Sequence, residues 1–72
     1  MEKQPKPNDR VMLGKTIKNL RTSQGLSIRR FALMIGMDYS YICKIESGDA
    51  NATVDVLSKI AGGLGVNIRD LF

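Results

Sequence analysis

The sequence predicts a compact all-α domain of five helices, and three observations support this. Apolar residues recur at helical spacing in five separate segments of residues 9–72. No stretch shows the sustained alternation of apolar and polar residues that is typical of a half-buried strand. Four glycines each follow a segment with helical spacing, where a glycine can adopt the left-handed conformation that ends a helix: Gly25, Gly36, Gly48 and Gly65.

The first eight residues differ from the rest of the chain. They contain both prolines and no periodic apolar pattern, so we expect residues 1–8 to form a flexible tail and residues 9–72 to form the folded domain. The first helix is expected from about Asp9 to Ser23. It carries Leu13, Ile17 and Leu20 on its inner face, and Lys15 and Lys18 on its outer face.

The second and third helices are short and share a tight turn at Gly36. Ser27 and Asp38 are good N-cap residues, so the two helices are expected to begin there. Helices this short are not stable alone, and two of them joined through a glycine and resting on longer helices suggest a helix-turn-helix. The residues expected to face the core are Phe31, Ala32, Ile35, Ile42 and Ile45.

The last two helices lie between residues 53 and 72. The fourth begins near Thr53, and Gly62 and Gly63 each cost about 1 kcal/mol relative to alanine, which predicts a soft last turn. The fifth is short and is capped by Asn67, with Asp70 three residues later. The expected core residues are Val54, Leu57, Ile60, Ala61 and Leu64 in the fourth helix, and Ile68 and Leu71 in the fifth.

Composition excludes several classes of site. The chain of 72 residues has no histidine and one cysteine, Cys43, which argues against a zinc site, histidine-based catalysis and an internal disulfide. It has no nucleophile–base spacing and no glycine-rich phosphate loop, so we expect neither an enzyme nor a cofactor. No apolar run approaches the roughly 20 residues that a membrane span needs.

Basic residues are concentrated in the first half of the chain. The net charge is +4, and residues 1–37 hold eight basic residues against two acidic ones. Residues 38–72 hold three basic residues against five acidic ones. A polarised basic half suits a polyanionic partner, either nucleic acid or an anionic membrane, whereas ordinary solvated surface charge is the alternative.

The stretch LSIRRFALMIGMDYSYICKIESG, residues 26–48, resembles the phage-repressor, Cro-type (XRE) helix-turn-helix family. Residues 13–21 resemble the first helix of that family, and residues 54–72 resemble its fourth and fifth helices. The resemblance implies that residues 9–72 form a lambda-repressor-like DNA-binding domain. Its third helix would enter the major groove while the second rests across the DNA backbone.

The resemblance also implies roles for individual residues. The base-contacting residues would be Tyr39, Ser40 and Lys44, and the phosphate-contacting residues would include Ser27, Ser47 and Asn51. The family commonly pairs an arginine late in its first helix with a glutamate at the end of its third, which implies a structural salt bridge between Arg21 and Glu46.

Arg29 and Arg30 stand in the first turn of the second helix, where cations oppose the helix dipole. Facing DNA phosphates would explain them, because phosphates bind well at helix N-termini, whereas tolerated surface charge is the alternative.

The expected function is a sequence-specific DNA-binding transcriptional regulator of the repressor or controller type. It would act in the cytoplasm as a homodimer on a palindromic or near-palindromic operator in double-stranded DNA, with no membrane partner. The alternative is a protein-interaction module that keeps the fold without specific DNA reading. That alternative is suggested by Ile28, where the family often has glutamine, by the acidic Asp49, and by Leu33 and Met34, which are either extra core or an exposed patch.

Overall fold

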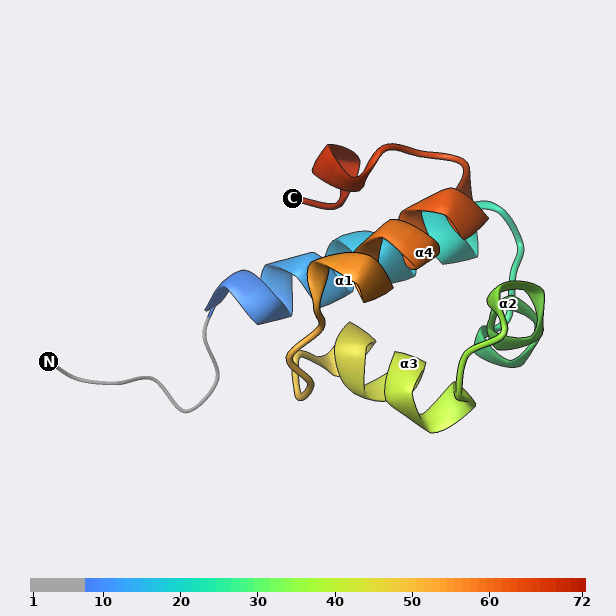
Figure 1. Ribbon diagram of the computed structural model, residues 1–72, viewed down its shortest axis with the longest axis horizontal. Helices are drawn as coiled ribbons and strands as arrows, with labels where there is room; N and C mark the ends of the chain where they lie inside the picture. Colours follow the sequence, from blue (N-terminus) through green and yellow to red (C-terminus); the bar gives the residue numbers. More distant parts are fainter. Residues whose placement is uncertain (1–7) are drawn as a thin grey trace, which may run out of the picture.

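The computed structural model describes residues 8–72, which form four α-helices and one 3₁₀ helix (Figure 1). The helices are α1 (Asn8–Ser23), α2 (Ile28–Ile35), α3 (Tyr39–Ser47) and α4 (Val54–Leu64), followed by the 3₁₀ helix η1 (Ile68–Leu71). The all-α prediction is confirmed for this part of the chain, which contains no strand. The count of five α-helices is wrong, because the fifth segment is a 3₁₀ turn.

The last helical segment, η1, is too short to propagate as an α-helix. Nucleating a helix fixes several residues for one hydrogen bond, and η1 has only four residues. It closes instead with the tighter pattern in which the Asp70 N–H donates to the Asn67 carbonyl at 2.9 Å. The Asp70 carboxylate accepts from the Asn67 N–H at 3.0 Å, as the predicted cap requires.

The predicted flexible tail falls almost entirely outside the described residues, which exclude residues 1–7. Its last residue, Asn8, is the first residue of α1 and not part of a tail. The other predicted helix starts are confirmed. The side chains of Ser27, Asp38 and Thr53 accept backbone N–H groups at the beginnings of α2, α3 and α4.

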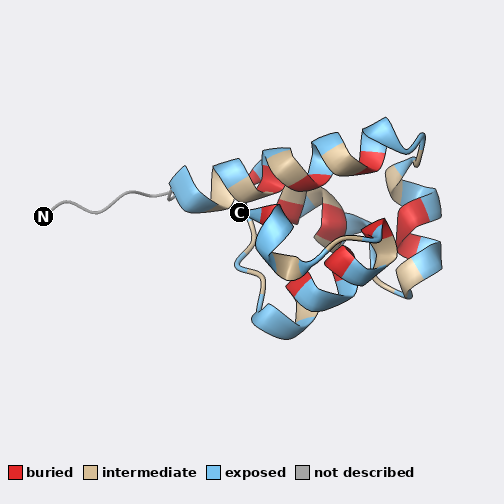
Figure 2. Cartoon of the chain, turned by 90° about the horizontal axis from the view of Figure 1, so that it is seen from above, coloured by how far each residue is buried: buried red, intermediate tan, exposed pale blue. Residues whose placement is uncertain are grey.

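The helices pack around one small core. α3 packs chiefly against α1, α2 lies against α3 and α4, and η1 covers parts of α4 and α1. Figure 2 shows buried residues at the inner sides of the helices and exposed residues at the outer sides. The buried apolar residues are Ile17, Phe31, Ala32, Ile42, Ile45, Leu57, Ile60, Ala61, Leu64 and Leu71.

Most of the predicted core is present, with one error. Leu13, Leu20, Ile35 and Ile68 are half-buried against the core. Val54, which was expected inside, is 69% exposed because it is the first residue of α4, and Val56 packs against the core in its place.

The turn between α2 and α3 depends on Gly36. This residue has φ 64°, and its N–H and that of Met37 donate to the carbonyls at the end of α2. Left-handed conformations are unfavourable for residues with a Cβ, so glycine suits this corner. The same left-handed conformation occurs at all four glycines that were predicted to end helices.

Candidate nucleic-acid interface

α3 has one buried side and one exposed side. Ile42 and Ile45 are 0% and 2% exposed, and they hold the helix against the core. Ser40, Lys44 and Ser47 follow one another at i, i+4 and i+7, so they form a stripe on the other side, where all three are exposed. Tyr39, at the start of the helix, is 45% exposed. The three predicted base-contacting residues are therefore uncovered by the rest of the domain.

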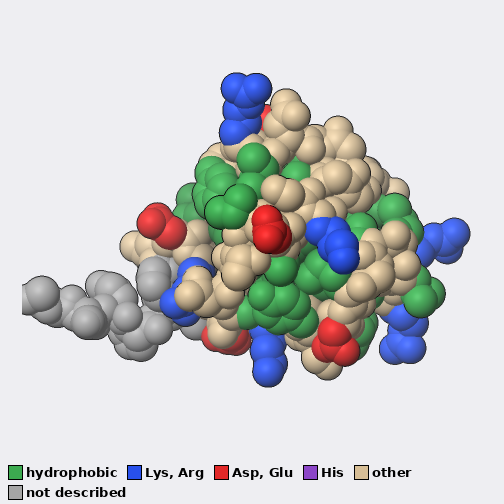
Figure 3. Space-filling view, viewed as in Figure 1, with side chains coloured by type: hydrophobic (Ala, Val, Ile, Leu, Met, Phe, Trp, Pro, Cys, Tyr) green, Lys and Arg blue, Asp and Glu red, His purple; other side chains and the backbone are tan. Residues whose placement is uncertain are grey.

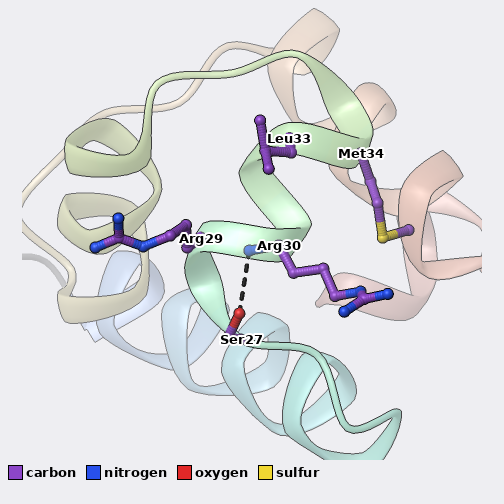
Figure 4. A pocket seen from close by; sticks show the side chains of 5 residues that line it. All are labelled: Ser27, Arg29, Arg30, Leu33 and Met34. Atoms are coloured by element: carbon purple, nitrogen blue, oxygen red, sulfur yellow. Dashed lines mark hydrogen bonds between the residues drawn. The ribbon is translucent and has the colours of Figure 1, made fainter.

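The first turn of α2 carries the two arginines that were predicted to contact DNA phosphates. Arg29 and Arg30 are exposed, and their side chains leave the turn in opposite directions (Figure 4). The Ser27 hydroxyl oxygen accepts the Arg30 N–H at 3.1 Å, and this bond leaves the hydroxyl hydrogen available to donate outward. Together with Leu33 and Met34 these residues line a shallow surface hollow.

A contact between Arg29 and Tyr39 joins the beginnings of α2 and α3. The guanidinium carbon of Arg29 lies over the Tyr39 ring, 5.3 Å from its centre, within the range of a cation–π interaction. The sequence predicted Arg29 as a phosphate contact and Tyr39 as a base contact, and it gave no sign of this contact between them. Neither helical spacing nor a capping motif links them, because the turn through Gly36 lies between them.

Arg21 and Glu46 form the salt bridge that the sequence analysis expected. Arg21 Nε donates to Glu46 Oε2 at 2.7 Å, and Arg21 Nη2 donates to Glu46 Oε1 at 2.9 Å. Arg21 Nη1 donates to the Leu26 carbonyl at 2.6 Å, so one guanidinium connects α1, the loop before α2 and the end of α3. The two side chains are only 7% and 5% exposed.

The hydrogen bond to Glu46 raises the pKa of Arg21 above its ordinary value, although burial acts in the opposite direction. A cation with a raised pKa loses its stabilising contribution only as the pH rises through the folded-state pKa. That range lies far above neutrality for an arginine. The arginine end of this salt bridge therefore stays charged across the ordinary pH range.

The end of α3 and the loop after it are less suited to binding phosphate than the family resemblance implies. Ser47 and Asn51 are exposed, as a phosphate contact requires. The Ser47 hydroxyl, however, lies 2.9 Å from the Asp49 carboxylate and also bonds the Lys44 carbonyl at 3.1 Å. Ser47 would have to rotate away from Asp49 to donate to a phosphate.

Asp38 begins α3, and its carboxylate accepts the Tyr41 N–H at 3.1 Å. We predict that Asp38→Ala lowers the free energy of unfolding by about 1 kcal/mol, because this N–H loses its partner at the helix end. Asp38→Asn keeps an acceptor oxygen and should retain most of that stability. Urea unfolding followed by circular dichroism compares the two variants, and equal stability of Asp38→Ala and the native chain would show that the cap contributes nothing.

The basic side chains do not gather on the face drawn in Figure 3. They project from several edges of the molecule, and acidic side chains lie between them. The excess of basic residues in the first half of the sequence therefore does not form one continuous patch on this face. Within residues 8–72, every helix falls short of the length and apolarity needed to cross a bilayer.

Comparisons with known proteins match nearly the whole described domain. Residues 17–71 match the sequence profile of the helix-turn-helix family. The control protein C.MunI from Mycoplasma sp is 36% identical over 64 residues, which cover 88% of this chain and 86% of that protein.

Solved structures show the same similarity. The restriction-modification controller protein C.AhdI from Aeromonas hydrophila superposes with a TM-score of 0.89 at 35% identity, covering 92% of this chain and all of that one. The biofilm regulator SinR, solved in complex with DNA, superposes with a TM-score of 0.80 at 31% identity, covering 83% of this chain and 97% of that one.

Proposed function

The chain belongs to the helix-turn-helix family, and from this membership we propose that it is a sequence-specific DNA-binding transcriptional regulator whose α3 enters the major groove. One observation carries the proposal. Tyr39, Ser40 and Lys44 stand exposed on a helix whose far end is held by the buried pair of Arg21 and Glu46. A rigid helix with an uncovered polar stripe can read base edges.

The side chains of that stripe suit the major groove. The Lys44 ammonium can donate to guanine O6 and N7, and the Ser40 hydroxyl can donate or accept with several bases. Tyr39 can contact a thymine methyl group with its ring or a phosphate with its hydroxyl. We assign base reading to these three residues.

Phosphate contacts would come from the beginning of α2. Its N-terminal N–H groups favour anions, and Arg29 and Arg30 add charge there. The Ser27 hydroxyl can donate beside them. Ser47, at the end of α3, and Asn51, in the loop that follows, would also approach the DNA backbone. These contacts would supply most of the affinity but little of the specificity.

One copy of α3 is too short to specify a single site in a genome, and a dimer would double the number of base pairs that are read. α3 has nine residues, so it is about 14 Å long and spans about four base pairs at 3.4 Å each. Four base pairs recur too often in a genome to specify one site. Two copies with their α3 helices about 34 Å apart would read two half-sites of a palindromic or near-palindromic operator.

The names of the relatives support regulation and not catalysis. C.MunI and C.AhdI are called controller proteins, and SinR is called a master regulator. We therefore propose a repressor or controller role in the cytoplasm and assign no catalytic step to this chain.

Selection of bound sites from random double-stranded DNA tests the proposal. We expect the enriched sequences to share two related half-sites whose centres lie about 10 base pairs apart, or a multiple of that, and binding to weaken steeply with salt. Sedimentation at several protein concentrations would reveal the dimer. Failure to enrich any sequence, with no salt-dependent binding to random DNA, would refute the function.

Arg30→Glu should separate stability from DNA binding. The new glutamate would stand three residues after the Ser27 cap, completing a capping box and favouring the helix dipole, so we expect a gain of about 0.5 kcal/mol in the free energy of unfolding. Binding to every DNA sequence should weaken, and the slope of log affinity against log salt should fall by about 1.

Arg69→Glu is the matched control for this measurement. It makes the same change of net charge on η1, which packs chiefly against α4 and α1. If Arg69→Glu and Arg30→Glu alter the affinity and its salt dependence equally, the effect of Arg30 is only one of net charge.

The alternative of a protein-interaction module has one observation in its favour. Leu33 and Met34 are 79% and 54% exposed, and both line the hollow on α2. If a partner protein and not DNA binds this domain, replacing both by serine should abolish that binding. The same double variant should leave site-selective DNA binding intact if the regulator proposal is right.

A further inference from the structure

We propose that Arg29 is a positioning residue for Tyr39, and that through this contact one guanidinium links a phosphate contact to base reading. The inference rests on the proposed function and deepens it. It starts from the placement of the Arg29 guanidinium over the Tyr39 ring, 5.3 Å from the ring centre.

Both partners stand on fixed points of the backbone. Arg29 is the second residue of α2, just after the Ser27 cap, and Tyr39 is the first residue of α3, just after the Asp38 cap. The turn through Gly36 joins the two helices. Because both backbones are held, a contact between the side chains restricts the rotamers that Tyr39 can adopt.

An exposed tyrosine at a helix start otherwise has rotational freedom. Tyr39 is 45% exposed, so the core does not hold its ring. Restricting the ring before DNA binds lowers the entropy that ordering it on the DNA would cost. Arg29 therefore fixes which base step the Tyr39 ring meets.

A cation–π contact leaves arginine able to bind an anion. The guanidinium is planar, and its N–H groups lie in its plane, so one face can rest on an aromatic ring while the edge donates to a phosphate. Lysine lacks this geometry, because an ammonium group has no flat face. A phosphate at the edge of Arg29 would hold the guanidinium, and with it the Tyr39 ring, in one place.

Arg30 offers a matched comparison within the same helical turn. It carries the same charge next to Arg29, and its side chain leaves α2 in the opposite direction (Figure 4). Both arginines are exposed, so replacing either one removes a cation without opening the core. Only Arg29 has the ring contact with Tyr39.

The first experiment compares Arg29→Gln and Arg30→Gln on a selected operator and on a random duplex. Arg30→Gln should weaken both affinities by the same factor and preserve their ratio. Arg29→Gln should also lower the ratio by about two- to fivefold, because positioning of Tyr39 is lost as well as charge. Arg29→Lys should keep the salt dependence of binding, but its ratio of operator affinity to random-duplex affinity should still be lower than that of the native chain.

A double-mutant cycle with Tyr39→Leu checks that the effect passes through the ring. The loss of operator preference in Arg29→Gln should shrink towards none when Tyr39 is already leucine. Additive losses, or an unchanged ratio in Arg29→Gln, would overturn the inference and leave Arg29 as a phosphate contact only. Absence of DNA binding by the native chain would instead refute the proposed function.

The contact itself can be measured without DNA. In NMR spectra of the native chain we expect the Arg29 side-chain protons to be shifted upfield by the ring current of Tyr39. The shift should persist in Tyr39→Phe and Arg30→Gln and disappear in Tyr39→Leu. Its absence from the native chain would overturn the inference whatever the DNA measurements give.

Discussion

Glu46→Gln is expected to lower the free energy of unfolding by about 3–5 kcal/mol, the cost of leaving one member of a buried ion pair without its partner. The Arg21 guanidinium would keep its charge and its bond to the Leu26 carbonyl, but it would face a neutral amide in a site where its side chain is 7% exposed. Small domains have only about 5–15 kcal/mol of stability in total, so the variant should be largely destabilised at physiological temperature.

Urea unfolding followed by far-UV circular dichroism measures this loss. Asp55→Asn is the control, because it neutralises an exposed carboxylate in the first turn of α4 and should cost less than about 1 kcal/mol. If Glu46→Gln costs no more than the control, the salt bridge does not hold α3 to α1.

Replacing both members of the ion pair tests whether the loss of stability comes from a buried charge left without its partner. Arg21→Met with Glu46→Leu should recover much of the stability that Glu46→Gln loses, because no buried charge is then left alone. The hydrogen bond to Leu26 would also be absent in that variant, so recovery need not be complete. A double variant less stable than Glu46→Gln would contradict the desolvation argument.

Gly14→Ala is expected to have the second largest effect. Gly14 is buried in the middle of α1, against the end of α3. A Cβ at this position would overlap the backbone carbonyl oxygens of Ile45 and Glu46, and backbone atoms held by helical bonds cannot move aside cheaply. We expect a loss of about 1–3 kcal/mol, or more if α3 is displaced.

Gly62→Ala makes the same chemical change where space is open. No atom lies within 4 Å of a Cβ at Gly62, which is exposed in α4. There the better helix propensity of alanine should raise the free energy of unfolding by about 1 kcal/mol. Thermal and urea unfolding of the two variants should therefore move in opposite directions, and equal shifts would refute the close contact of α1 and α3.

Displacement of α3 would also have a functional consequence. Ile45 and Glu46 are near the end of the helix whose beginning carries Tyr39 and Ser40. A Gly14→Ala variant that remains folded should therefore lose preference for the selected operator more than it loses affinity for random DNA. Retention of the native preference would show that α3 keeps its orientation without the close contact.

The sequence alone predicted the capped starts of α2, α3 and α4, the glycines that end the helices, and most of the residues that face the core. Caps such as Ser27 and Asp38, and the turn glycine Gly36, act through hydrogen bonds and dihedral angles within a few residues. Such signals can therefore be recognised from a few neighbouring residues of the sequence. The exposed stripe on α3 followed from the same periodicity, and its assignment to DNA came from the family resemblance.

The tertiary structure decided what depends on residues distant in the chain. The need for glycine at residue 14 comes from the backbone of α3, and the contact of Arg29 with Tyr39 comes from the angle at which α2 meets α3. The exposure of Val54 likewise follows from where α4 starts relative to its neighbours. Local propensity carries no information about the distance between two helices, because the side chains at their contact set that distance.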